Sequence, residues 1–341
     1  MDSLSQIVLG AATGELIAGR KLGNRALWLG AIGGTLPDLD VLGGFALEPL
    51  ANLAFHRGIT HSMLFWIIGA VIAGELTFKL ARRSDLSRFA WYTFYFATFA
   101  THVLLDCFTM YGTQLYAPFA DTRVAWSTIA VADPMYTLPF LMALIALSRQ
   151  AKGSSRRRFW HRFGWLWSLG YLALTVVNKG HVEEKLWAGL AGQNIPASRL
   201  VSNPTILNNV LWNAAAETED AFWLAQYSIF DDGLPQWHRM DKDTAWFEAH
   251  AGDPVVERLS WFSDGFLYKS PVPVREGEWM LGDLRFGSFV ARPGLGEDLI
   301  FRFLVAEAPD GLRFLSAEGG PKKGEEADFF PLLWSRMWGR D

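Results

Sequence analysis

Four stretches of this 341-residue chain are apolar and carry little or no charge over the length that a helix needs to cross a bilayer. Crossing the hydrocarbon core takes roughly 20 helical residues. Residues 59–80 and 89–111 reach this length, and residues 134–148 and 163–178 reach it once their flanks are counted. No Asp or Glu occurs over residues 134–182, a run that is hard to reconcile with a water-exposed fold. The pattern predicts an integral membrane protein.

The first 36 residues predict a helical hairpin ahead of these stretches. In "SLSQIVLGAATGELIAG", Gly10, Gly14 and Gly19 alternate with alanines, which suits close packing between helices. The run "NRALWLGAIGGTL" follows a basic turn at residues 20–25. A cleavable signal peptide is not expected, because the start carries Asp2 and lacks Lys and Arg. We therefore predict an α-helical integral membrane bundle of about six helices, some of them short.

Three basic turns orient this bundle. They lie at residues 20–25, 81–88 and 149–162, and the positive-inside rule places such turns in the cytoplasm. The loops 37–58 and 112–133 then lie on the outer face, together with the whole C-terminal part. The chain is expected to be a multi-pass protein of the inner (cytoplasmic) membrane, with its C-terminal part extracytoplasmic, that is, periplasmic.

Charge divides the chain into two parts. Residues 1–180 hold 16 Lys and Arg against 10 Asp and Glu, whereas residues 181–341 hold 15 against 25, so the net charges +6 and −10 sum to −4. We predict a membrane-embedded helical domain at 1–180 that carries the metal-binding residues described below, followed by a soluble α+β domain at 181–341. Nucleic acid is not an expected partner, because neither part has an extended basic face.

The second part is rich in strand and turn patterns. The runs "VERLSWFSDGFLYKS", "EWMLGDLRFGSFVARP" and "DLIFRFLVAEAPDGLRFLSAE" alternate or are rich in β-formers, and "APDGL" predicts a hairpin turn. The run "NPTILNNVLWNAAAETEDAFWLAQY" fits either a helix or strands. The tail "DFFPLLWSRMWGRD" fits an amphipathic helix, with Trp334 and Trp338 facing the sheet or the bilayer surface.

Ionisable side chains gather at one predicted face of the helical part. Such groups are costly at a membrane and usually functional. The orientation predicted from the Lys and Arg residues of the basic turns places all of these ionisable groups at the outer membrane–water boundary. Their common location is therefore independent support for that orientation. The cluster consists of Asp38, Asp40, His56, His61, His102, Asp106 and Asp133.

This set of side chains favours a divalent metal site. Imidazole nitrogen and carboxylate oxygen bind Zn²⁺, Mn²⁺ or Fe²⁺. We predict that one or two ions, with zinc as the expected metal, are held by Asp38, Asp40, His56, His61, His102 and Asp106. Arg57 would clamp a phosphate or carboxylate, Thr60 and Ser62 would support the ligands, and Asp106 or Asp133 would serve as general base.

Each of these features also has an ordinary structural explanation. A histidine at a helix start can be a cap or an interfacial residue, and "PDLD" is a common turn. His102 and Asp106, four residues apart on one helix face, can form a buried hydrogen-bonded pair. It is their gathering on one side of one helical domain that favours the metal site.

Several other polar residues have weaker cases. Asp2 is open to a ligand role, an N-cap role or none, and Glu15 is expected to face the bundle and pair with a cation or a hydroxyl. Glu75 lies near the predicted cytoplasmic end of its helix. Cys107 is expected to pack, and the remaining histidines lack metal-like spacing.

Several motifs resemble one known family. They are "MDSLSQIVLGAATGE", "GGTLPDLDV", "HRGITHS", "HVLLDCFTMYGTQLYAPF" and "ADPMYTLPF", and they resemble the YdjM-like (LexA-regulated) family of bacterial inner-membrane, metal-dependent hydrolases over about residues 1–180. The resemblance implies metal binding at the six residues named above and some importance for Asp2 and Gln6. The aspartates followed by "HRG-x-THS" are also distantly similar to zinc-dependent phospholipase C enzymes.

We therefore predict a membrane-bound, metal-dependent hydrolase. Metal-activated water would attack an ester, and the expected substrate is a phosphoester of a lipid or of a lipid-linked small molecule in the bilayer. A non-catalytic metal-binding envelope protein or transporter-like scaffold is the alternative. A membrane peptidase ranks last, because no H-E-x-x-H motif occurs.

Overall fold

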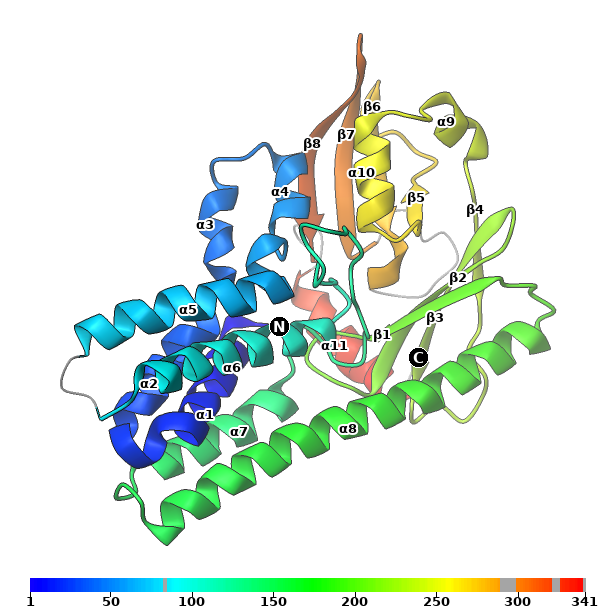
Figure 1. Cartoon of the computed structure of the whole chain (residues 1–341). Coiled ribbons are helices and arrows are strands. Elements are labelled where there is room, and N and C mark those ends of the chain that lie inside the picture. Colours follow the sequence, from blue (N-terminus) through cyan, green and yellow to red (C-terminus); the bar gives the residue numbers. More distant parts are fainter. Residues whose placement is uncertain (82–84, 289–298, 321–325, 340–341) are drawn as a thin grey trace. The chain divides into compact units, whose positions relative to one another are not determined.

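The computed structural model (Figure 1) describes residues 1–81, 85–288, 299–320 and 326–339. It divides into two compact units. The helical unit comprises Met1–Ala46, Phe55–Val176 and Ile206–Asn208, and the sheet unit comprises Leu47–Ala54, Val177–Thr205 and the chain from Asn209 onward. The domain boundary at residue 180 stays a prediction.

The helical unit is built from α-helices and short 3₁₀ turns, and Figure 1 shows α1, α2 and α6 side by side. In chain order the elements are α1 (Ser3–Leu22), α2 (Asn24–Thr35), η1 (Pro37–Leu39), α3 (Asp40–Gly44), η2 (Ile59–His61), α5 (Met63–Leu80), α6 (Arg88–Cys107) and α7 (Pro134–Ser148). The residues of α4 (Pro49–Phe55) lie mostly in the sheet unit, and α8 (Ser155–Gly192) begins in the helical unit. A helical N-terminal region is therefore present as predicted.

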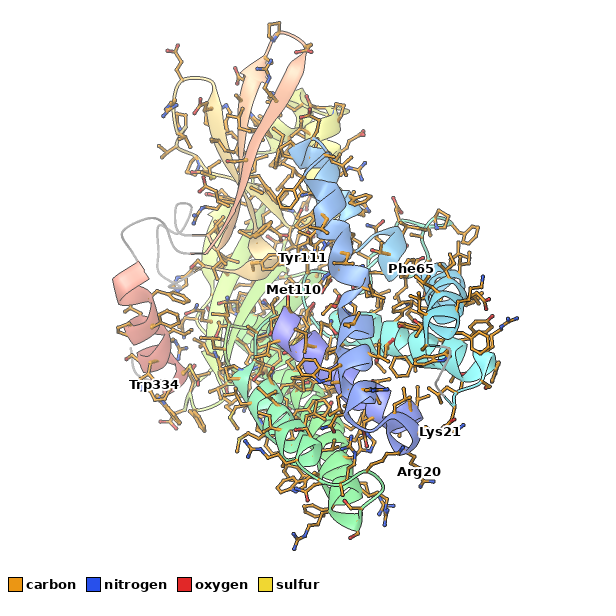
Figure 2. The ribbon with its side chains drawn as sticks, turned by 90° about the vertical axis from the view of Figure 1, so that its left-hand side faces the viewer. Arg20, Lys21, Phe65, Met110, Tyr111 and Trp334 are labelled. Atoms are coloured by element: carbon orange, nitrogen blue, oxygen red, sulfur yellow. The ribbon has the colours of Figure 1, made fainter. Side chains whose placement is uncertain are left out.

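Glycines let α1 and α2 pack almost backbone to backbone. A Cβ atom built at Gly10 would lie 2.4 Å from the carbonyl oxygen of Gly30, and one built at Gly14 would lie 2.3 Å from the carbonyl oxygen of Ala26. The hairpin turns within the predicted residues 20–25, where Gly23 adopts φ 60°. Figure 2 shows Arg20 and Lys21 together at this end of α1. The glycine pattern thus reports a real close approach.

We expect Gly30→Ala to destabilise the protein by about 1–3 kcal/mol, the cost of overpacking a tight contact. The added methyl would lie 2.3 Å from the Gly10 carbonyl oxygen and 2.9 Å from the Gly14 Cα, both backbone atoms that cannot swing away. Gly170→Ala on α8 is the matched control, because no heavy atom of the described residues lies within 4 Å of its added Cβ. Thermal unfolding in detergent measures both; equal unfolding temperatures would contradict the close packing.

Among the described residues, α5 is the one helix both long enough and apolar enough to cross a membrane. Its apolar side chains are largely exposed, with Ile67, Ile72 and Leu76 each more than half accessible. Helices also form at the other three predicted spans, but α7 is short, and α6 and α8 do not meet the same criterion. Part of the basic turn at 81–88, residues 82–84, lies outside the described residues.

Two four-stranded antiparallel sheets form the sheet unit, with strand orders β1-β2-β3-β4 and β5-β6-β7-β8. Together with its helices they give the α+β character that the sequence predicts. The strands of the first sheet are β1 (Arg199–Pro204), β2 (Leu211–Glu217), β3 (Ala221–Ser228) and β4 (His238–Asp241). Those of the second are β5 (Leu267–Lys269), β6 (Glu278–Asp283), β7 (Phe301–Ala308) and β8 (Gly311–Gly319). The remaining elements are α9 (Thr244–Ala249), α10 (Pro254–Phe262), η3 (Leu284–Phe286) and α11 (Glu326–Met337).

Two predictions for this unit are confirmed and one is partly wrong. The "APDGL" turn joins β7 to β8, and the tail forms α11 as far as Met337, although residues 340–341 lie outside the described residues. The stretch "VERLSWF" is helix α10, not a strand. Asp253 caps this helix and Pro254 occupies its first position, while Val255, Val256, Leu259 and Phe262 form a buried stripe at helical spacing.

Candidate metal centre

Four side chains of the helical unit converge on one point: Asp38, His61, His102 and Asp106. Asp38 lies on η1, which Pro37 opens, and His61 lies on η2, just before Ser62 caps α5 through the Phe65 amide. His102 and Asp106 are one turn apart on α6. All four ligand atoms lie within 4.8 Å of one another.

The distances within this group fit a tetrahedral ion. His61 Nε2 lies 3.3 Å from Asp38 Oδ1, 3.4 Å from Asp106 Oδ2 and 3.3 Å from His102 Nε2. His102 Nε2 lies 3.4 Å from Asp38 Oδ1 and 3.5 Å from Asp106 Oδ2. A tetrahedron with metal–ligand bonds of roughly 2.0–2.1 Å has edges of about 3.3–3.4 Å. Five of the six donor separations match this value closely.

Hydrogen bonds leave both imidazoles ready to act as ligands. His102 Nδ1 lies 2.6 Å from the carbonyl oxygen of Gly34, which can only accept, so Nδ1 keeps a proton and Nε2 is the nitrogen at which a metal ion would replace a proton. His61 Nδ1 faces Thr60 Oγ1 at 3.0 Å and Asp40 Oδ2 at 3.5 Å. Two Nε2 lone pairs 3.3 Å apart repel each other unless a cation or a proton lies between them. An oxygen acceptor behind a ligating imidazole is typical of protein metal sites.

Three of the four donor side chains are buried, and one is partly exposed to solvent. The side chains of His61, His102 and Asp106 are at most 1% exposed, whereas that of Asp38 is 25% exposed. Asp106 Oδ2 is buried without a hydrogen-bond partner among the described residues, a costly arrangement for a carboxylate that a bound cation would relieve. Both observations fit a metal ion approached from the side of Asp38.

The pKa of Asp38 reflects its two histidine neighbours. Burial by itself raises the pKa of this carboxyl group, but hydrogen bonds with His102 and His61 outweigh burial, and the pKa falls well below its usual range. Asp38 therefore stays ionised at every pH at which the protein is expected to work, as a metal ligand requires.

Asp40 and His56, which the sequence predicts as ligands, lie one layer behind the group. Asp40 Oδ1 is 3.0 Å from His56 Nδ1, and Oδ2 accepts bonds from the Arg57 amide (3.0 Å) and the Thr60 hydroxyl (2.9 Å). With both oxygens engaged, Asp40 orients His61 through Nδ1 instead of joining the four donors. Burial raises the pKa of Asp40, but the bond with His56 and the nearby histidine charge lower it overall.

We expect Asp40→Asn to weaken metal binding about 10- to 100-fold, the usual cost of changing a residue that orients a ligand. The amide keeps one acceptor oxygen but loses the charge that holds the His61 ring in place. Competition with a metallochromic chelator gives the affinity directly. An affinity equal to that of the unmodified protein would show that Asp40 does not orient His61.

Arg57 adds a buried cation beside the group. Its side chain is 6% exposed, Nη2 lies 3.2 Å from Asp106 Oδ1, and Nη1 donates to Thr109 Oγ1 at 3.0 Å. The backbone of Arg57 adopts φ 60°, which costs a non-glycine residue about 1–3 kcal/mol. The strain is consistent with a turn whose geometry is set by the site, since both its amide and its side chain contact site carboxylates.

These residues lie in a region that matches a known family. The YdjM inner membrane protein family matches residues 1–182, more than half of the chain. The chain belongs to the YdjM inner membrane protein family. Membership supports the predicted inner-membrane localisation, and the matched region contains all four converging donors.

Two further comparisons complement the YdjM match. The chain is 25% identical over 324 residues to "Uncharacterized protein YfhP" of Bacillus subtilis (strain 168), an alignment that covers 89% of this chain and 93% of that protein. The similarity therefore extends through the sheet unit as well. No solved structure matches the chain significantly.

Two residues of the YdjM-matched start reach the group, Gln6 from α1 and Met1 from just before it, and the sequence motifs indicate only Gln6. Gln6 Nε2 donates to Asp106 Oδ1 at 3.0 Å and to the His102 carbonyl oxygen at 3.2 Å. The amino group of Met1 also contacts Asp106 Oδ1. The motif "MDSLSQ" hinted at Gln6 but gave no signal for Met1. Asp2 instead caps α1 through the Ser5 amide.

Asp133, predicted as a general base, is not brought to the four donors. It caps α7 by accepting bonds from the Met135 and Tyr136 amides, and its second oxygen accepts the Tyr171 hydroxyl at 2.8 Å. Burial raises the pKa of Asp133, with the Tyr171 bond opposing. Its carboxylate is therefore occupied by the local fold.

Glu15 faces the interior of the helical unit, as predicted, and has a cation partner. Arg157 Nε and Nη2 bind its two carboxylate oxygens at 2.7 and 2.6 Å. Glu75 pairs with Lys79 and Arg88. Neither acid belongs to the converging group.

Proposed function

We propose that this protein is a membrane-bound, metal-dependent hydrolase whose centre is formed by Asp38, His61, His102 and Asp106. The observation that carries the proposal is the donor geometry, with five separations of 3.3–3.5 Å around two facing imidazole nitrogens. A bound divalent ion would supply Lewis acidity and activate water. Zn²⁺ suits two imidazoles and two carboxylates best, and Mn²⁺ or Fe²⁺ also accept such donors.

The chain's own residues would hold and orient the reacting groups. Asp106 would bind the ion through Oδ2 while Arg57 and Gln6 hold its Oδ1. Arg57 would also neutralise an anionic substrate oxygen, since a guanidinium matches phosphate geometry. Asp106 thus serves as ligand in this proposal, and Asp133 has no part because its carboxylate caps α7.

Membership of an inner membrane family supports an amphiphilic substrate. A site in such a protein meets lipids and lipid-linked molecules first, and Arg57 favours an anionic group, so a phosphoester of a lipid or lipid-linked molecule is the proposed substrate class. We also propose a multi-pass topology with the sheet unit on the periplasmic side. Support comes from exposed apolar side chains beyond α5, including Met142 on α7 and Leu166 on α8, both more than two-thirds accessible.

One observation favours a second candidate, a non-catalytic metal protein of the envelope. Four protein donors close a tetrahedral shell, which is typical of structural zinc sites, whereas catalytic zinc keeps a position for water. The partial exposure of Asp38 favours catalysis instead, because an exposed carboxylate can yield a position.

Hydrolysis by the purified protein in detergent decides between these candidates. Soluble phosphoesters, lipid phosphoesters and peptides are offered before chelation, after chelation and after return of Zn²⁺ or Mn²⁺. The proposal expects phosphoester turnover that chelation abolishes and metal restores. Bound metal without turnover on any phosphoester would favour the non-catalytic candidate, and peptide turnover alone would contradict the substrate class.

A further inference from the structure

Tyr111 lies next to two guanidinium groups at the edge of the metal centre. The Cζ atom of Arg57 is 4.9 Å from the centre of the Tyr111 ring, and that of Arg123 is 5.2 Å from it. The His56 ring meets the same ring edge-on at 5.5 Å. Figure 2 marks Tyr111 and its neighbour Met110 in the chain that follows α6.

The backbone between α6 and α7 holds this pair of cations in place. Thr113 and Val124 form an isolated antiparallel bridge with bonds of 3.0 and 2.9 Å, which brings Arg123 back beside Gly112. A Cβ atom at Gly112 would lie 3.1 Å from the Arg123 Cβ, and Gly112 adopts φ 84°. The Gln114 amide donates to the Arg57 carbonyl oxygen at 3.1 Å. The loop is thus fastened to the strained turn that carries Arg57.

Arg57 keeps an unused donor in this environment. Its Nε is buried without a hydrogen-bond partner among the described residues, although Nη1 and Nη2 are engaged. A buried guanidinium donor without an acceptor is costly, and an anion oxygen would satisfy it. Arg123 is only partly buried and donates to the Tyr111 carbonyl oxygen, so the second cation lies nearer to solvent.

Electrostatics explain why two cations are needed here. With a divalent ion bound, the charges of the ion and of Arg57 only balance the three carboxylates of Asp38, Asp40 and Asp106, so the centre by itself has no net positive charge to attract a phosphate. Arg57 is partly neutralised by Asp106. A second guanidinium on the solvent side adds positive charge and matches phosphate with paired donors.

We propose that Arg57 and Arg123, both held against Tyr111, form a phosphate-binding subsite beside the metal centre. Arg123 is its specificity-determining residue, selecting substrates that carry a phosphate group. This inference rests on the proposed hydrolase function and deepens it by assigning substrate recognition to the segment between α6 and α7. The recognised chemistry is a phosphate, either free or at the head of a lipid.

Binding of inorganic phosphate to metal-loaded protein in detergent, followed by calorimetry, tests the subsite without requiring turnover. We expect Arg123→Gln to weaken phosphate binding about 10- to 100-fold, the effect of losing hydrogen bonds to a charged group. Arg123→Lys should recover only part of the loss, because it lacks the planar fork. Arg20→Gln is the matched control: Arg20 is an exposed arginine in the last turn of α1, and this variant should bind as the unmodified protein does. Metal content should be equal in all variants.

Phosphatidic acid vesicles form a second arm that separates lipid from free phosphate. Loss of both inorganic phosphate and vesicle binding in Arg123→Gln supports recognition of the phosphate itself, and loss of vesicle binding alone supports a lipid headgroup as its source. Unchanged binding in both arms, or no binding by the unmodified protein, overturns the subsite. If phosphate binding depends on Arg123 but the protein shows no turnover, the hydrolase function is rejected and the subsite is kept. If the protein shows turnover but its phosphate binding does not depend on Arg123, the hydrolase function is kept and the subsite is rejected.

Discussion

His61→Ala is expected to yield a protein that neither retains a divalent metal nor hydrolyses its substrate. His61 Nε2 lies 3.3–3.4 Å from each of the other three donors, and its side chain is fully buried. Removing a ligand should exceed the cost of changing a residue that orients one, so metal affinity should fall by more than about 100-fold. Asp38→Ala should behave in the same way. Elemental analysis and a phosphoester assay on the same sample measure both effects.

An exposed histidine provides the control for this experiment. His181 lies on the part of α8 that belongs to the sheet unit and is exposed, so His181→Ala should keep full metal content and full activity. Turnover by a metal-free His61→Ala protein would contradict the proposed chemistry outright.

Arg157→Met is expected to cause the largest loss of stability, about 3–5 kcal/mol, the usual cost of leaving a buried charge unpaired. The side chains of Arg157 and Glu15 are only 3% and 8% exposed. Arg157 binds both Glu15 oxygens, donates to Asn24 Oδ1 at 2.8 Å and reaches the carbonyl oxygens of Leu147 and Gln150. One guanidinium therefore ties together α1, α2, α7 and the start of α8.

Thermal unfolding of the purified protein measures this effect. The neighbouring Arg156 is exposed on the same helix, and Arg156→Met should leave the unfolding temperature nearly unchanged. Adding Glu15→Gln to Arg157→Met should recover part of the lost stability, because it removes the unpaired carboxylate charge. If Arg157→Met and Arg156→Met unfold at the same temperature, the ion pair does not hold the helices together.

The sequence is sufficient to predict which residues gather at the site, but not which of them face the metal position and which lie behind the ligands. Four of the six predicted ligands converge. For two of them, His102 and Asp106, the shared position follows directly from their spacing on one helix. Asp40 and His56 lie behind them for a reason that no spacing reveals. The Arg57 amide and the Thr60 hydroxyl occupy Asp40 Oδ2 within a turn whose φ of 60° is not encoded in any motif.

Other differences follow from contacts distant in sequence. The side chain of Gln6 and the amino group of Met1 reach Asp106 across about one hundred residues, so only packing brings them to the site. The sequence does not distinguish an aspartate that caps a helix, as Asp133 does, from one whose carboxylate is free to act as a general base. In the sheet unit, the apolar residues of α10 also suit a strand, so their pattern alone predicts β structure; the Asp253 cap and Pro254 favour the helix that is observed.

We propose that Asp38, His61, His102 and Asp106 together hold one metal ion. X-ray absorption at the metal edge, combined with elemental analysis of the purified protein, measures both the ligands and the number of ions. We expect one ion per chain, coordinated by nitrogen and oxygen atoms, with scattering from two imidazole rings. In a His102→Ala protein that still binds metal, we expect the scattering of one imidazole ring to be lost. A fully folded protein that binds no divalent metal, or a metal shell without imidazole, would contradict this proposal.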